Sequence, residues 1–140
     1  MPLKKLAELT VQSHLDSLTD VDQFTERNVS QIAALAQQLD DIAISVSEAV
    51  NNAIVHGNKL DDTKVVRIRF YLGSNFLRIV VQDQGVGFTP EEIPDPRKKE
   101  NLLKASGRGI LIIRHLMDRV CFKHLKHGMR IIMDKSFAKA

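Results

Sequence analysis

In two stretches of the first half of the chain, apolar residues recur at the three- and four-residue spacing of an α-helix. The first stretch runs from about Val21 to Gln38, with acidic residues in its first turn. The second runs from about Asp40 to His56, and Gly57 is suited to end it. Both are predicted helices; their apolar positions are Val21, Phe24, Val29, Ile32, Leu35 and Ala36, and then Ile42, Val46, Ala49, Val50, Ala53 and Ile54.

Alternation of apolar and polar residues predicts strands elsewhere. Residues 66–72 and 77–81 alternate on either side of a Gly-Ser-Asn turn, so they predict a hairpin. A second hairpin is predicted over 120–134, and a short strand near 9–11. A third helix is predicted over 107–119. The preceding segment, 89–106, contains three prolines and a charged run, which is typical of a lid or binding loop.

The resulting order is strand, helix, helix, strand, strand, lid, helix, strand, strand. Antiparallel hairpins combined with separate helices predict an α+β fold, arranged as a two-layer sandwich. At 140 residues the chain fits one domain, large enough to bury a core without disulfides or metals. Its one cysteine, Cys121, excludes an intrachain disulfide and is expected to be a small buried side chain in a strand.

Composition narrows the classes of function. The net charge is +3, the basic residues are spread along the chain, and there is one tyrosine and no tryptophan, so a nucleic-acid surface with stacking aromatics is not expected. No apolar stretch is long enough to span a bilayer, and charged residues near the N-terminus argue against a signal peptide. A cytoplasmic location is therefore expected.

The most informative motif is Asp83-Gln84-Gly85-Val86-Gly87-Phe88, which follows the apolar run 79–81. By the two-residue period of a strand, Asp83 continues a row that faces the core, where a carboxylate is costly unless it is paired. It either accepts a hydrogen bond from an exocyclic amine such as that of adenine, or caps a turn. Gly85 and Gly87 would let the backbone approach a ligand closely.

Glu48 and Asn52 are four residues apart, so they lie on the same face of the second predicted helix. If this face borders a ligand, Asn52 offers a neutral oxygen to a magnesium ion, and Glu48 can orient or deprotonate a hydroxyl that attacks a terminal phosphate. Otherwise the two residues belong to a solvated helix face.

Gly107-Arg108-Gly109 opens the third predicted helix. Free backbone N–H groups and the helix dipole favour phosphate at such a position, and Arg108 would add a charge-assisted contact. The alternative is a simple junction between loop and helix. The chain has no Walker A sequence, and its Gly-Val-Gly precedes a lid rather than a helix, which argues against P-loop and Rossmann chemistry.

Taken together, the three motifs resemble the boxes of the GHKL ATPase superfamily. Residues 48–57 are similar to its N box, 83–88 to its G1 box and 107–110 to its G2 box. The superfamily includes gyrase, the heat-shock protein ninety chaperones, histidine kinases and anti-sigma factor serine kinases. The chain is most similar to the last group over nearly its whole length, because it reads as a lone ATPase domain and residues 107–120 resemble that group's G2 helix.

The resemblance implies a Bergerat-type sandwich with a mixed, mostly antiparallel sheet and helices on one face. It also implies a single domain over residues 1–140, with an ATP lid at about 88–106. Glu48 would be the general base, and Asn52 would hold Mg²⁺. The ATP-binding residues implied by the resemblance are Asn52, Asp83, Gly85, Gly87, Gly107, Arg108 and Gly109.

The implied activity is phosphoryl transfer from ATP to a serine of a STAS-domain anti-anti-sigma partner, by a homodimeric kinase that also binds a sigma factor. Two alternatives stay open. The chain could be a nucleotide-dependent binding module without catalysis, although the presence of Glu48 argues against this. It could also be a STAS-directed kinase in a pathway without a sigma factor, which the sequence does not distinguish.

Overall fold

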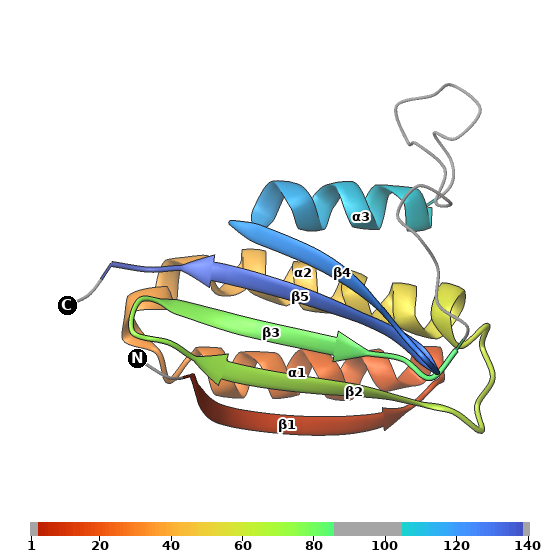
Figure 1. Ribbon diagram of the computed structural model, residues 1–140. Coiled ribbons are helices and arrows are strands. Elements are labelled where there is room, and N and C mark those ends of the chain that lie inside the picture. The colour runs from red at the N-terminus through yellow and green to blue at the C-terminus, as the bar shows by residue number, and fades with distance from the viewer. Residues whose placement is uncertain (1–2, 86–104, 139–140) are drawn as a thin grey trace.

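Five strands form one sheet in the order β1-β2-β3-β5-β4 (Figure 1). The computed structural model describes residues 3–85 and 105–138, and every strand pairing within them is antiparallel. Both predicted hairpins are present, as the pairs β2-β3 and β4-β5. The strands are β1 (Lys4–Gln12), β2 (Val65–Leu72), β3 (Phe76–Gln82), β4 (Arg119–Leu125) and β5 (Gly128–Ser136).

Three helices cover one face of the sheet, and α2 lies between α1 and α3 (Figure 1). They are α1 (Leu18–Val29), α2 (Leu39–Asn52) and α3 (Ala105–Leu116). Alternate residues of each strand point toward the helices; Ile68, Phe70 and Ile79, for example, are fully buried. One continuous apolar core fills the space between the two layers. The predicted two-layer α+β sandwich is therefore confirmed.

The first predicted helix is shorter than the periodicity indicated. Helix α1 ends at Val29, and a 3-10 segment (Ala33–Gln38) follows after extended backbone at Ile32. Near the end of α1, the Asn28 amide donates to the Phe24 carbonyl at 2.8 Å. Such side-chain bonds to the backbone compete with helix propagation. The break lets Leu35 enter the core with no exposed surface, which is why the apolar spacing continues past the end of the helix.

The second predicted helix changes its winding near its end. The α-helical hydrogen bonding of α2 stops at Asn52, and Ala53–Gly57 form a π-helical turn. The Asn58 N–H donates to the Ala53 carbonyl at 2.8 Å and closes this wider turn. Gly57 ends the helical region, as predicted. π turns are often found at functional sites, and this one joins the two halves of the site described below.

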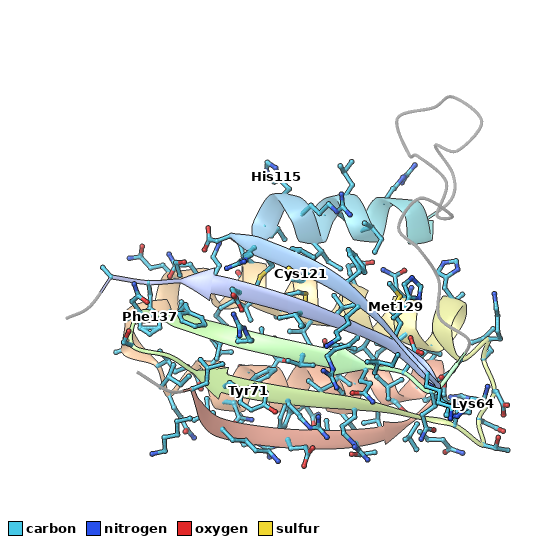
Figure 2. All side chains as sticks on the ribbon, viewed as in Figure 1. Lys64, Tyr71, His115, Cys121, Met129 and Phe137 are labelled. Atoms are coloured by element: carbon cyan, nitrogen blue, oxygen red, sulfur yellow. The ribbon has the colours of Figure 1, made fainter. Side chains whose placement is uncertain are left out.

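Within residues 3–85 and 105–138, no helix covers the opposite face of the sheet, which carries ion pairs. Arg78 of β3 donates two hydrogen bonds to Asp134 of β5, at 2.8 and 2.9 Å, and Arg69 donates to Glu8 at 2.7 Å. Cys121 lies on β4 and is exposed (Figure 2), which corrects the expectation that it is buried. Because side chains alternate along β4, Val120 and Phe122 pack against the core and Cys121 points the other way.

Candidate nucleotide-binding site

Asp83 follows directly on β3 and is buried, with 2% of its surface exposed, as the strand periodicity predicted. Its Oδ1 accepts hydrogen bonds from the backbone N–H groups of Gly85 at 3.0 Å and Met129 at 3.1 Å. Burial raises the pKa of this carboxyl, while the two backbone hydrogen bonds act in the opposite direction. Met129, at the start of β5, also accepts from the Asp83 N–H at 3.1 Å, so its backbone both donates to and accepts from Asp83.

Glycines surround the Asp83 carboxylate because the backbone approaches it closely. A Cβ added to Gly57 would overlap the carboxylate, and a Cβ on Gly85 would overlap the Gly57 carbonyl. At Gly128 a Cβ would overlap the Asp83 carbonyl, and the φ of +143° at Gly128 is itself one that favours glycine. Gly85 of the predicted motif is thus packed against the Gly57 backbone, and its predicted close approach to a ligand stays a prediction. Gly87 lies outside the described residues.

A buried asparagine holds the loop after Asp83 in place. The Asn58 Oδ1 accepts from the Gln84 N–H at 2.8 Å, and its Nδ2 donates to the Val65 carbonyl at 3.0 Å. The Gln84 side chain in turn accepts from the Val65 N–H at 2.8 Å. Sequence reasoning missed the positioning roles of Asn58, Gly128 and Met129. For Asn58 its place directly after the motif glycine was a usable signal, whereas the other two come from a distant strand.

Asn52 and Glu48 lie on α2, on the side that meets α3. Asn52 is fully buried, yet among the described residues neither its Oδ1 nor its Nδ2 has a hydrogen-bond partner. Glu48 is half-buried, and this burial raises the pKa of its carboxyl. The pair therefore belongs to a semi-enclosed polar site and not to a solvated helix face. An unpaired, buried amide is unusual in proteins and indicates a missing partner such as a ligand or ion.

Helix α3 presents a glycine to this pair. A Cβ on Gly109 would lie 2.5 Å from the Glu48 Oε2 and 3.4 Å from the Asn52 Nδ2. The third motif is thus brought against the second, as a shared site requires. Gly107 and Arg108 lie in the first turn of α3, which begins at Ala105, two residues earlier than predicted; Arg108 is exposed. Of the predicted lid, residues 88–104 lie outside the described residues.

The π turn connects the two parts of the site. Gly57 is five residues beyond Asn52 and touches the Asp83 carboxylate, so α2 contributes to both ends. His56, in the same turn, is half-buried, and burial lowers its pKa, with a further contribution from Lys59. The arrangement places a buried hydrogen-bond acceptor at one end and an amide, a carboxylate and a helix start at the other.

The donor set fits magnesium held largely by a nucleotide. In residues 3–85 and 105–138, no group of three or more His, Cys, Asp or Glu side chains gathers as a metal cage. Mg²⁺ commonly keeps several waters and takes few protein ligands alongside phosphate oxygens. The unpaired Oδ1 of Asn52 suits such an ion. No helix in the described part of the chain is long and apolar enough to cross a membrane.

A five-stranded antiparallel sheet backed by three helices, with a glycine-enclosed acid at the end of β3, places this chain in the class of GHKL-type ATPase domains. Residues 11–135 match the family model described as "Histidine kinase-like ATPase domain", and the chain belongs to this family.

Curated relatives and solved structures agree with this placement. The chain is 36% identical over 112 residues to an "Anti-sigma F factor" of Clostridium perfringens. This match covers 76% of this chain and 79% of the relative. It is 33% identical over 117 residues to an "Anti-sigma F factor" of Geobacillus kaustophilus, and this match covers 80% of this chain and 79% of the relative.

Among solved structures, the chain resembles the RsbU and RsbW domains of a Mycobacterium tuberculosis protein, with a TM-score of 0.64 and 16% identity, over 96% of this chain and 33% of that one. It also resembles the histidine kinase domain of a blue-light activated histidine kinase from Erythrobacter litoralis, with a TM-score of 0.58 and 20% identity, over 91% and 62% of the two chains. These two likenesses concern the fold alone.

Proposed function

We propose that this chain is an ATP-dependent protein serine/threonine kinase and anti-sigma factor. It would phosphorylate a STAS-domain anti-anti-sigma protein and bind a sigma factor in a partner-switching system. The relatives named as anti-sigma F factors support the pathway. The observation that carries the catalytic part is the buried, unpaired Asn52 beside the half-buried Glu48, both against Gly109 at the start of α3.

Asp83 would bind the adenine of ATP. Its Oδ1 is occupied by two backbone N–H groups, which leaves acceptor capacity for an exocyclic amine. Gly85 and Gly87 would shape the pocket. Asn58 would act as a positioning residue, because it ties the loop after Asp83 to the start of β2.

The phosphates would lie toward the start of α3. Gly107 and Gly109 allow close approach to backbone N–H groups in the first turn, and the exposed Arg108 can add a charge-assisted contact. Asn52 would hold Mg²⁺ through its Oδ1. When bound, the ion would offset negative charge on the phosphates of ATP.

Glu48 would act as the general base. The acceptor serine Oγ forms a bond to the terminal phosphorus as the bond from that phosphorus to the bridging oxygen breaks. ADP leaves with the bonding electrons, and Glu48 takes the hydroxyl proton. Because burial raises the pKa of Glu48, the carboxylate is a stronger base than an exposed glutamate would be.

Phosphate transfer tests this proposal. The chain is mixed with Mg²⁺, ATP labelled at its terminal phosphate, and the STAS-domain protein encoded nearest to its gene. Label is expected on a serine of that protein. Glu48→Gln should slow transfer by about 100-fold or more while leaving ATP affinity within a few fold. Glu26→Gln, on the exposed side of α1, is the matched control and should behave as the unaltered chain.

Each result has a definite meaning. Undiminished transfer by Glu48→Gln would remove Glu48 as the base. Binding of ATP and of the STAS-domain protein without transfer would instead favour a nucleotide-dependent binding module.

A further inference from the structure

A groove lies between α1 and α2, next to the candidate catalytic residue. Its volume is about 260 Å³, and it is lined by Asp22 of α1 and by Ala43, Ile44, Ser47 and Glu48 of α2. The Ile44 side chain is apolar yet 45% exposed, one of the few large apolar residues that the described surface presents to solvent. An exposed apolar side chain at a groove is suited to contact with another molecule.

Glu48 connects this groove to the nucleotide site. It lines the groove on the α1 side, while its Oε2 lies against Gly109 of α3 on the other. A serine on a segment bound in the groove could therefore reach the Glu48 carboxylate with its hydroxyl oxygen turned toward the phosphates proposed at the start of α3. A general base must contact the hydroxyl while the hydroxyl oxygen itself faces the phosphorus, and a carboxylate shared by the groove and the nucleotide site allows this.

The chemistry of the lining indicates what the groove accepts. Two carboxylates, Asp22 and Glu48, line it, and no lysine or arginine is among its lining residues. Ala43 and Ile44 contribute apolar surface to the lining, and Ser47 contributes a small hydroxyl. Asp22 is exposed at the rim, and partial desolvation raises the pKa of its carboxyl; a positively charged group of the substrate would favour its ionised form.

We propose that this groove is the docking site for the acceptor segment of the protein substrate, and that this segment carries an apolar side chain for Ile44 and a lysine or arginine for Asp22 beside its serine. The proposal rests on the proposed kinase function and adds a determinant of substrate choice. Asp22 and Ile44 act here as specificity residues, because they contact the substrate without touching the reacting atoms.

Charge reversal at two nearby positions of α1 tests the proposal. Asp22→Lys is compared with Asp20→Lys, which makes the same change on the same helix but lines a separate groove between α1 and β1. The probe is the STAS-domain protein encoded nearest to the gene, and its affinity is measured with Mg²⁺ and a non-hydrolysable ATP analogue present. We expect Asp22→Lys to weaken binding at least tenfold, and Asp20→Lys by less than twofold.

A second pair addresses the apolar contact. Ile44→Ser should weaken binding of the same protein several-fold, whereas Leu15→Ser, at a leucine that is 47% exposed, should not. All four variants are expected to bind the ATP analogue normally, which shows that the fold is intact. In transfer assays the KM for the protein substrate should rise for Asp22→Lys and Ile44→Ser, while kcat stays within a few fold.

The outcomes separate this proposal from the kinase function. If Asp22→Lys and Asp20→Lys bind the STAS-domain protein equally well, the groove is not its docking site, even if transfer proceeds normally. Selective weakening by Asp22→Lys supports the groove even if no transfer is seen, because binding is measured without chemistry. Failure of the unaltered chain to bind the STAS-domain protein overturns both proposals.

Discussion

At Asn52 the fold buries an amide whose two polar atoms have no partner in the described part of the chain. Leaving a buried donor or acceptor unpaired costs about 1–3 kcal/mol. A residue selected for stability alone would not be an asparagine at this position. We infer that this asparagine serves the proposed metal–nucleotide site at the expense of folding free energy.

Replacing Asn52 with alanine should separate the two effects. The free energy of unfolding is expected to stay within about 1 kcal/mol of the unaltered value or to rise, because the unpaired amide is removed from a helix. The Mg²⁺-dependent part of ATP affinity should be lost. Urea unfolding and titrations with and without Mg²⁺ measure both, and Asn51→Ala is the neighbouring control. An intact magnesium response in Asn52→Ala would contradict its role as a ligand.

If Glu48 is the base, stability and transfer should respond to pH in opposite directions. Burial raises the pKa of its carboxyl in the folded chain above the unfolded value, so the folded state holds the proton more tightly. The contribution of Glu48 to stability is thus greatest below the unfolded pKa. It is lost as pH rises to and through the folded pKa. A base must be ionised, so transfer should fail in the same range as pH falls.

This range is measured by the pH dependence of kcat/KM for transfer and of unfolding free energy. The acid limb of the rate profile is expected at a pH above that of an ordinary glutamate. The matching fall in stability with rising pH should disappear in Glu48→Gln but persist in Glu26→Gln. An acid limb at the usual glutamate range would show that burial does not tune this group for catalysis.

At the scale of elements, periodicity predicted the strands well because each has one face on a shared core. Residues 66–72 alternate, and in 77–81 Leu77, Ile79 and Val81 share a face although Val80 is also apolar; both segments form strands with a turn at Gly73. The helix ends were harder to predict. The apolar spacing of 21–38 continues across the break at Ile32, because the 3-10 segment still directs Leu35 inward. A spacing pattern records which residues are buried, not the hydrogen bonding that connects them.

The candidate site was predictable only as separate motifs. The sequence indicated Glu48, Asn52 and Asp83 as polar residues at informative positions. Their connection through the π turn to Gly57 depends on backbone geometry that no local pattern encodes. The contact between Asp83 and Met129 joins residues 46 positions apart, so it becomes visible only when the sheet is assembled.

The packing of α3 on α2 predicts a specific coupling between Gly109 and Glu48. Alanine favours a helix over glycine by about 1 kcal/mol, yet a Cβ at Gly109 would lie 2.5 Å from the Glu48 Oε2. We expect Gly109→Ala to destabilise the chain and to abolish transfer. In a Glu48→Ala background the same change should become neutral or stabilising. Urea unfolding of the four proteins completes the double-mutant cycle, and additive effects would contradict the contact.

For the whole molecule, the proposed nucleotide site draws on both layers of the sandwich. Asp83 lies at the end of the sheet, whereas Asn52 and Gly109 belong to the helical layer. A ligand that contacts both should therefore stabilise the domain as a unit.

Removal of nucleotide should accordingly lower the melting temperature of the whole domain. With ATP and Mg²⁺ at 100 times the dissociation constant, the stabilisation is expected to be about 2.7 kcal/mol. Asp83→Asn should lose most of this increment, because a neutral amide replaces the negatively charged carboxylate that would accept a hydrogen bond from the adenine amine. Thermal unfolding by circular dichroism measures the shift. An equal ATP-dependent shift in Asp83→Asn would remove Asp83 from the adenine site.

The uncovered face of the sheet has a practical consequence for the oligomeric state. We expect a homodimer, which sedimentation equilibrium would test. Cys121 is exposed on this face, and it is the only cysteine of the chain. An exposed thiol can oxidise to a disulfide between two molecules. In buffer without reductant, air oxidation can therefore link copies covalently and imitate a native dimer, whereas the same thiol in reducing buffer provides a single, defined position for a fluorescent label.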